Sequence, residues 1–420
     1  MARYVSIDRD RSAERIGRDI DTLGGAAYTS SPRAIRRYAY IGEYRATLDF
    51  FVTRLRSLGF GVDEDPVGNL VARNRPHGEP VFGIGSHCDS NRNGGRYDGT
   101  MGVVTALEVC RLNAELGLDL PLQLISFLEE EASGFGQLLL GSRIMAGRVD
   151  EAELRERSRA IDDGRTFWEH AKEAGYEPAR WRESARALDD LVGWIELHIE
   201  QGRVLQDTGD RIGIVGSIAG CRHGDVEVRG RADHAGATPM DARQDASTVV
   251  AECVLELERL AREASRTAPT VGTVGDIALD PGIINVVPGR AGFTMDIRGV
   301  ADEVFRGVFD DIAAFARGAA RRRGMTAEVR ERQLVPATPM DERVMGAIED
   351  AVHTAGEPYR TMHSGAAHDT MCVADRVPTG MIFVPCRDGL SHVPEEDADP
   401  ADAAVGAEVM LNAIAALTGG

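Results

Sequence analysis

The sequence predicts an α/β fold: a mainly parallel sheet with helices on both faces, into which a smaller α+β domain is inserted. Through residues 9–199, short apolar runs typical of buried strands alternate with segments of helical spacing, as in parallel βαβ units. After Gly209 the pattern changes and strand-like segments predominate. At 420 residues the chain also exceeds the usual size of one hydrophobic core. We therefore expect one domain formed by residues 1–210 and 334–420, and a second formed by residues 211–333.

The elements of the first domain are predicted from apolar spacing and from the polar residues and glycines that bound each segment. Helices are expected over residues 9–25, 42–58, 101–116 and 341–355. Strands are expected over residues 67–72, 81–85, 120–127, 192–199 and 380–384, and a polar helical excursion over 150–190. Open α/β sheets place their ligand sites at the carboxyl ends of the strands, so residues that follow these strands are the site candidates.

The second domain has a different order of elements. Strand-like residues 212–232 precede a helix over 241–265, and two or three strands follow over 270–299. A helix over 301–323 and a strand over 325–335 complete the segment. This order predicts a small ferredoxin-like antiparallel sheet with two helices on one face.

Composition excludes several classes of function. A net charge of −19 argues against a nucleic-acid partner, because binding to a phosphate backbone relies on clustered Lys and Arg. The six cysteines are scattered without a CxxC pair, which is typical of a reducing cytoplasm. We expect a cytoplasmic protein with no membrane partner, because we find neither a signal core nor a spanning apolar run. Lys172, the sole lysine, lies in a charged helical stretch, so Schiff-base chemistry is not expected.

The candidate site begins at His87, directly after the strand predicted over residues 81–85. Asp98 precedes the next helix, and a neutral imidazole with a carboxylate suits a divalent metal such as zinc. Asp89 could accept the second imidazole N–H of His87 and fix its tautomer. An H-x-D sequence after a strand is by itself more often structural, but further candidates follow other strands. These are the run Glu129–Glu131, then His198, then His392 near the C-terminus.

Three imidazoles and two carboxylates could hold two metal ions, with one carboxylate bridging them. A further glutamate would then serve as the general base. The alternative is that the glutamate triplet forms a solvated junction between strand and loop, as charge runs usually do.

A set of ordered motifs carries a resemblance to a known family. The motifs are Gly85-Ser86-His87-x-Asp89, Asn93-Gly94-Gly95-Arg96-Tyr97-Asp98-Gly99, Glu130-Glu131, Glu196-Leu197-His198-Ile199-Glu200-Gln201-Gly202, His234-Ala235-Gly236-Ala237-Thr238-Pro239-Met240, Asn285-Val286-Val287-Pro288-Gly289, Asp296-Ile297-Arg298, Ser364-Gly365-Ala366-Ala367-His368-Asp369 and Ser391-His392-Val393-Pro394-Glu395. Spread over about residues 37 to 410, they resemble the dinuclear-metal amidohydrolases. That family includes N-carbamoyl-L-amino-acid hydrolase, β-ureidopropionase, allantoate amidohydrolase and ureidoglycolate amidohydrolase, and is related to zinc aminoacylases and dipeptidases.

The resemblance implies two divalent metal ions per subunit, with Zn²⁺ the first choice and Mn²⁺, Co²⁺ or Ni²⁺ as alternatives. It places His87 and His198 on one ion, Glu131 and His392 on the other, and Asp98 between them. It also implies that Glu130 is the base that activates the bridging water. The triplet allows either Glu129-Glu130 or Glu130-Glu131 as the family's pair, and the position of Ala132 favours the second.

The remaining implied roles concern the substrate, a small molecule that carries a carboxylate. His234 would polarise the scissile carbonyl, and Arg298 would bind the substrate carboxylate through two parallel hydrogen bonds. Gln201, Asn285 and His368 would complete the substrate contacts. Family members are dimers joined through the inserted domain, here residues 211–333. A homodimer is therefore expected, and His234 could serve the partner's site.

The implied reaction is hydrolysis of a linear, non-peptide C–N bond in an N-carbamoyl amino acid or ureido acid, with release of ammonia. A related aminoacylase or dipeptidase is the alternative, and a catalytically silent homologue would have lost a ligand or Glu130. Five residues depart from the family's usual pattern and leave the exact substrate open. They are Cys88, Ala132, Gly134, Cys221 and Ala367.

Overall fold

The computed structural model describes residues 4–31 and 33–419, and these divide into two compact units. The first unit comprises the chain up to Gly216 and from Met340 onward, and the second comprises Ser217–Pro339. The expected boundaries at 210 and 334 therefore move a few residues later. The reason is that strand β6 (Ile212–Ile218) pairs with β15 (Thr379–Val384) and so belongs largely to the sheet of the first unit.

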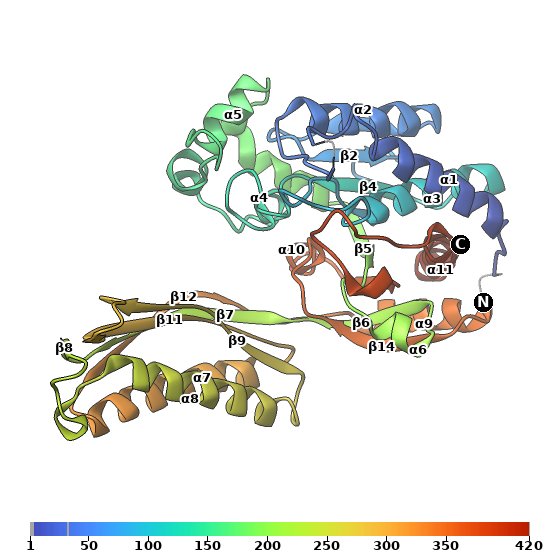
Figure 1. Cartoon of the computed structure of the whole chain (residues 1–420). Helices are drawn as coiled ribbons and strands as arrows, with labels where there is room; N and C mark the ends of the chain where they lie inside the picture. Colours follow the sequence, from blue (N-terminus) through green and yellow to red (C-terminus); the bar gives the residue numbers. More distant parts are fainter. Residues whose placement is uncertain (1–3, 32, 420) are drawn as a thin grey trace. The chain divides into compact units, whose positions relative to one another are not determined.

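A mixed sheet forms the centre of the first unit (Figure 1). Its nine strands lie in the order β1-β2-β4-β3-β5-β15-β6-β13, with β14 beside β6, and the edge strand β13 is the last part of the second unit's segment. Its central strands β4, β3, β5 and β15 are parallel, whereas β1, β2, β6 and β13 pair antiparallel to their neighbours. The other bounds are β1 (Gly61–Glu64), β2 (Leu70–Arg73), β3 (Val81–His87), β4 (Leu122–Phe127), β5 (Leu191–Ile199), β13 (Thr338–Pro339) and β14 (Tyr359–Ser364). The prediction of a mainly parallel sheet holds for its centre.

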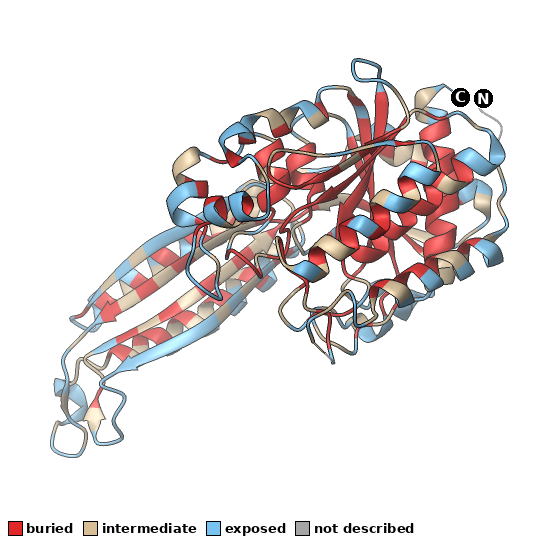
Figure 2. Ribbon diagram, turned by 90° about the horizontal axis from the view of Figure 1, so that it is seen from above, coloured by how far each residue is buried: buried red, intermediate tan, exposed pale blue. Residues whose placement is uncertain are grey.

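Apolar side chains cover both faces of this sheet. Phe82 and Ile84 of β3 pack in one core cluster with the helices α1, α3 and α11, whereas Val81 and Trp194 belong to a second cluster with Met145 of α4. Figure 2 shows the central strands as a buried layer between helices. The α-helices are α1 (Arg9–Leu23), α2 (Gly42–Ser57), α3 (Thr100–Leu116), α4 (Leu140–Met145), α5 (Phe167–Glu173), α6 (Val204–Thr208), α9 (Glu342–Ala355), α10 (Thr370–Val373) and α11 (Pro400–Thr418). A π-helix, η1 (Glu153–Arg157), and two 3-10 helical segments, η2 (Pro178–Leu188) and η4 (Arg387–Gly389), complete the helical elements of this unit.

Helix α11 is apolar enough, by length and composition, to span a membrane, but it is a core helix of this unit. Its residues from Ala403 to Ala415 are buried, and it packs against α1, α3 and α9. Neither α11 nor β14 is among the elements predicted from the sequence. A helix that is apolar on every side lacks the amphipathic spacing from which helices are predicted.

The second unit is built on a four-stranded antiparallel sheet in the order β12-β7-β11-β9, and α7 and α8 pack against it. A separate two-stranded ladder joins β8 to β10. The bounds are β7 (Gly220–Arg229), β8 (Asp233–His234), η3 (Met240–Ala242), α7 (Ala246–Ala264), β9 (Thr270–Asp280), β10 (Val286–Val287), β11 (Arg290–Gly299), α8 (Asp302–Arg322) and β12 (Thr326–Val335). This is the α+β arrangement that the segment's pattern predicts.

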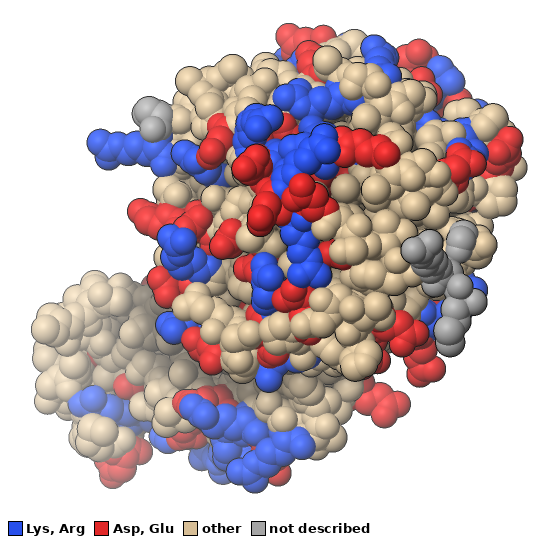
Figure 3. Space-filling view, turned by 90° about the vertical axis from the view of Figure 1, so that its right-hand side faces the viewer, with Lys and Arg blue, Asp and Glu red and all other residues tan. Residues whose placement is uncertain are grey.

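The arginine-rich surface is largely paired with carboxylates. On the face shown in Figure 3, basic and acidic side chains are interspersed. Arg75 lies 2.7 Å from Asp119, and Arg45 lies 2.7 Å from Glu64. Such exposed or half-exposed pairs contribute little stability individually.

Candidate metal centre

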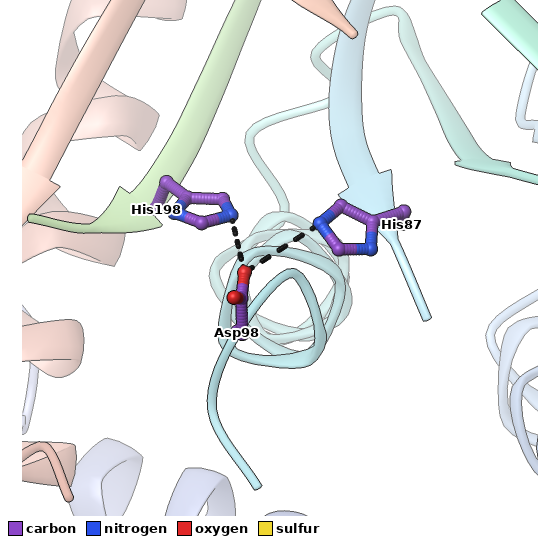
Figure 4. A group of neighbouring side chains, drawn as sticks. All are labelled: His87, Asp98 and His198. Carbon is purple, nitrogen blue, oxygen red and sulfur yellow. Dashed lines mark ion pairs between the residues drawn. The ribbon is translucent and has the colours of Figure 1, made fainter. Parts of the chain in front are cut away.

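The ends of two parallel strands and the start of a helix bring His87, Asp98 and His198 together (Figure 4). His87 is the last residue of β3, His198 lies at the end of the neighbouring strand β5, and Asp98 precedes α3 by two residues. Asp98 Oδ1 lies 3.1 Å from Nε2 of His198 and 3.7 Å from Nε2 of His87. Gly99 permits this approach, because an ideal Cβ at its positive φ of 60° would lie 2.3 Å from the His87 ring. All three side chains are buried.

A second group shares the same aspartate. Asp98 Oδ2 lies 3.1 Å from Nε2 of His392, which in turn lies 3.4 Å from Oε2 of Glu131. Asp98 and Glu131 are buried, whereas the His392 side chain is 48% exposed. The structure therefore brings the five predicted ligands into two groups that meet at Asp98.

The three consecutive glutamates have different surroundings. The Glu129 carboxylate accepts the backbone N–H groups of Ala39 (3.3 Å), Gly134 and Phe135 (2.8 Å), which assigns it a structural role. Glu130 Oε2 lies 3.8 Å from Nε2 of His87, and Glu131 faces His392. The geometry therefore favours Glu130 and Glu131, the second of the two alignments, as the functional pair.

Two of the residues that depart from the family pattern lie beside this run. Ala132 has a φ of 58°, a conformation that costs a residue with a Cβ more than it costs glycine. At Gly134 an ideal Cβ would lie 2.7 Å from the Glu129 carboxylate. A larger residue at 134 would therefore displace the Glu129 side chain.

Asp89 has a different contact from the one predicted. His87 Nδ1 lies 3.2 Å from the backbone carbonyl of Asp89, and the nearest carboxylate oxygen is 3.5 Å away. The carboxylate itself accepts the backbone N–H groups of Glu130 (3.1 Å) and Glu131 (3.0 Å). Asp89 thus fixes the imidazole through its backbone, and its side chain fixes the chain that carries the two glutamates.

The electrostatics of the site suit a bound cation. Burial, and then repulsion from Asp98, raises the pKa of Glu131 to about 8. Burial also raises the pKa of Glu130 well above its usual range, with a further contribution from Glu131. Oε1 of Glu131 is buried and has no hydrogen-bond partner among the described residues. Buried carboxylates of this kind are normally paired or bound to a metal, and imidazole with carboxylate is a donor set that divalent ions accept.

Two predicted substrate residues of the first unit lie beside these ligands. Nε2 of Gln201 lies 3.0 Å from Asp98 Oδ2 and 3.4 Å from Nε2 of His392. His368 is buried against His198, with ring centroids 4.6 Å apart, and its Nε2 lies 2.8 Å from the Ser364 hydroxyl. Burial, and then the neighbouring His198, lowers the pKa of His368 well below its usual range, so this imidazole is neutral.

The other predicted substrate residues belong to the second unit. The β8–β10 ladder pairs His234 with Val286, the residue after Asn285, and both His234 and Asn285 are exposed. Nδ1 of His234 accepts the N–H groups of Gly236 (3.0 Å) and Ala237 (3.1 Å). The proton of the neutral ring is therefore on Nε2, the tautomer that can donate to a carbonyl oxygen.

Arg298 lies on β11 in a paired state. Its Nε and Nη2 donate to the Asp296 carboxylate at 2.9–3.1 Å, and Nε2 of His223 lies 3.1 Å from Oδ1 of the same carboxylate. Burial raises the pKa of Asp296, but the hydrogen bonds from His223 and Arg298 outweigh it and lower the value to about 2. His223 thus belongs to the surroundings of Arg298.

Sequence reasoning missed two residues that hold the ligand segments. Arg37 is 1% exposed, and its guanidinium donates to the backbone carbonyls of Cys88 (2.6 Å) and Leu23 (3.2 Å) and to the Thr100 hydroxyl (2.8 Å). Glu396 is 4% exposed and contacts the backbone at Asp98. The position of Glu396 directly after the Ser391–Glu395 motif was the available signal for this residue. Nothing in the sequence distinguished Arg37 from the many other arginines.

Comparison with known proteins gives one family. The chain matches the model of peptidase family M20/M25/M40 over residues 83–416. It is 37% identical over 409 residues to an N-carbamoyl-L-amino-acid amidohydrolase from Paenarthrobacter aurescens, covering 96% of this chain and 98% of that protein. It is 33% identical over 375 residues to an allantoate amidohydrolase from Bacillus subtilis, covering 87% and 89%. An amidase of the hydantoinase/carbamoylase family from Burkholderia multivorans has a similar structure, with a TM-score of 0.85, 30% identity and 98% of each chain covered.

Proposed function

Because the chain belongs to peptidase family M20/M25/M40, we propose that it is a metal-dependent enzyme that cleaves the linear C–N bond of an N-carbamoyl amino acid or ureido acid. The resemblance drawn from the motifs is confirmed by this match and by relatives that are named amidohydrolases. The chain is accordingly a hydrolase of carbon–nitrogen bonds other than peptide bonds. The observation that carries the metal dependence is the pair of histidine–carboxylate groups that share Asp98, and the names of the relatives favour carbamoyl and ureido substrates.

Two divalent ions would be held by these groups, with zinc as our first choice and manganese as the main alternative. His87 and His198 would hold one ion, Glu131 and His392 the other, and Asp98 both. When bound, the ions would act as Lewis acids toward the attacking water and the scissile carbonyl.

The protein's own groups would handle the protons and the developing charge. Glu130 lies beside the first group, 3.8 Å from His87, and would take the proton of the attacking water and return it to the departing nitrogen. His234, with its proton on Nε2, would donate to the oxygen on which negative charge develops. Loss of ammonia would leave a carbamate, which decarboxylates to the free amine.

Arg298 would bind the carboxylate of the substrate. The guanidinium is planar and suits bidentate recognition of a carboxylate. Asp296 supports it through three contacts within 3.1 Å, so its orientation is fixed before the substrate arrives. Gln201 and His368 would contact the substrate beside the ligands.

The second unit supports a homodimer in which two chains share each site. His234 and Asn285 lie next to β10, close to the Arg290 end of β11, whereas Arg298 lies near the other end of that strand. At about 3.4 Å per residue, Arg290 and Arg298 are about 27 Å apart along β11. One small substrate cannot contact both ends, so we propose that His234 and Asn285 act on the partner's site.

The reaction is tested by metal reconstitution and a substrate panel. Protein loaded separately with zinc and manganese would be assayed for ammonia release from allantoate, ureidoglycolate, N-carbamoyl-β-alanine and several N-carbamoyl-L-amino acids. An N-acetyl amino acid and a dipeptide would be followed by release of free amine. Ammonia from one ureido or carbamoyl acid is the expected result. Free amine from only the acyl or peptide substrates would instead make the chain an aminoacylase or dipeptidase.

The base is tested by Glu130→Gln, with Glu129→Gln as the neighbouring control. We expect Glu130→Gln to reduce kcat by at least about a thousandfold with an unchanged metal content, because general-base catalysis and the water's orientation are lost together. Glu129→Gln should lower stability but retain turnover, since its carboxylate serves backbone amides. Retained activity in Glu130→Gln would overturn the assignment.

The shared site is tested by mixing two inactive variants, Glu130→Gln and His234→Ala. In a mixed dimer, the His234→Ala chain supplies Glu130 and the Glu130→Gln chain supplies His234, so one of the two sites is complete. The other site lacks both residues. Random exchange of subunits should therefore restore about a quarter of the wild-type sites. No recovery after verified subunit exchange would place His234 in its own chain's site or outside the chemistry.

A further inference from the structure

A buried carboxylate outside the predicted site links two of its segments. Glu396 lies between His392 and α11 and is 4% exposed. Its Oε1 accepts the backbone N–H groups of Tyr97 (2.7 Å) and Asp98 (3.0 Å), and its Oε2 accepts the Ser391 hydroxyl (2.9 Å). One side chain thus contacts both the backbone of Asp98 and the residue directly before His392.

The segment before Asp98 is shaped around this side chain. An ideal Cβ at Gly95 would lie 2.3 Å from both Cβ and Oε1 of Glu396. Real Cβ atoms do not approach so closely, so the Glu396 side chain can occupy this position only because residue 95 is a glycine. The Ser391 hydroxyl lies 3.0 Å from Asp98 Oδ2 as well as 2.9 Å from Glu396, and so sits between the two carboxylates.

His392 is the ligand candidate that most needs such support. Its side chain is 48% exposed, whereas those of His87, His198, Asp98 and Glu131 are buried. It has a φ of 62° and lies in a segment without helix or strand, after β15 has ended. Packing therefore orients four ligand side chains, whereas hydrogen bonds must orient the fifth.

We propose that Glu396 is a positioning residue that holds Asp98 and His392 together and so creates the affinity of the second metal group, Asp98–Glu131–His392. The inference rests on the proposed dinuclear site. The first group depends less on Glu396, because His87 and His198 are carried on the paired strands β3 and β5. Outer contacts of this kind typically change metal affinity or activity by about 10- to 100-fold.

The test is calorimetric titration of chelator-treated, full-length protein with Mn²⁺, and separately with Zn²⁺. Wild type should bind two ions per chain. Glu396→Ala removes all three contacts, so one ion should bind as in wild type and the other about 10- to 100-fold more weakly. Glu396→Gln keeps an acceptor for the two amides and should lose less. With saturating metal, kcat should follow the same order, with KM changed less than kcat.

Two further variants separate positioning from general stability. Gly95→Ala leaves Glu396 in the sequence but fills its space, so it should reproduce the selective loss of the second ion. Glu408→Ala removes another buried carboxylate, which pairs with Arg9 of α1 and lies outside the metal groups. It should lower the melting temperature without changing either metal affinity.

The outcomes distinguish this inference from its premise. Two ions bound with wild-type affinity in Glu396→Ala would overturn the role of Glu396 and leave the dinuclear site intact. Equal weakening of both ions, or the same loss in Glu408→Ala, would also overturn it, because the effect would not be selective. A wild-type chain that binds fewer than two ions would overturn the dinuclear premise itself.

Discussion

Replacing Asp89 by Asn tests the support of the two functional glutamates. Asp89 is fully buried, and each of its carboxylate oxygens accepts one backbone N–H, from Glu130 at 3.1 Å and from Glu131 at 3.0 Å. An Asn side chain has one acceptor oxygen for one of these backbone N–H groups, and its NH₂ group would face the other. The variant thus loses one charge-assisted hydrogen bond, worth about 1.5–3 kcal/mol, and leaves one buried N–H unpaired, at a cost of about 1–3 kcal/mol.

Relief of repulsion offsets part of this loss. Burial, and then the nearby Asp89 charge, raises the pKa of Glu129 to about 8, so a neutral residue at 89 eases the crowding of carboxylates. We expect the free energy of unfolding to fall by about 3 kcal/mol, once about 1 kcal/mol is allowed for this relief. Urea unfolding of chelator-treated protein measures the change without a contribution from bound metal.

The activity of the same variant separates the two roles of Asp89. Because the backbone of Glu130 loses its anchor, kcat of the metal-loaded variant should fall by about 10- to 100-fold. Asp65→Asn is the matched control, since Asp65 also accepts backbone N–H groups, from Val67 and Gly68, but in the turn between β1 and β2. It should lower stability and leave kcat unchanged. An Asp89→Asn protein within about 0.5 kcal/mol of wild type, with unchanged kcat, would refute the reasoning.

Two further predictions concern backbone strain and pH. Ala132→Gly should raise the free energy of unfolding by about 1 kcal/mol, because Ala132 has a φ of 58°; a lower melting temperature in this variant would contradict it. The hydrogen bond to Asp296 raises the pKa of His223 to about 10. This folded-state pKa exceeds the unfolded value of about 6.5, so the stabilisation is complete below about pH 6.5 and is lost as the pH rises through 10. His223→Gln should therefore cost up to about 1 kcal/mol at pH 6 and nothing above about pH 10.5, measured by urea unfolding across pH; a pH-independent cost would contradict it.

The alternation of elements was readable from the sequence because buried parallel strands form continuous apolar runs. Val81-Phe82-Gly83-Ile84 is such a run, and it forms the first four residues of β3. The edge strand β1 alternates between exposed and half-buried residues, and α11 is apolar on all sides, so neither carries the usual signal. The extra strand β14 and the antiparallel partners of the sheet depend on contacts between distant segments, which periodicity does not encode.

By itself, the sequence determined which side chains could form the site, because residue type and position after a strand are local properties. His87, Asp98, His198 and His392 could be named in this way, and the motifs gave the family. Only the tertiary structure decided which glutamate faces which histidine, because the direction of Glu129, Glu130 and Glu131 depends on the amides and imidazoles that surround them. The tertiary structure also showed that the Asp89 carboxylate accepts backbone N–H groups. It revealed Glu396 as a contact of the Asp98 backbone, because a hydrogen bond between residues 298 positions apart has no local signature in the sequence.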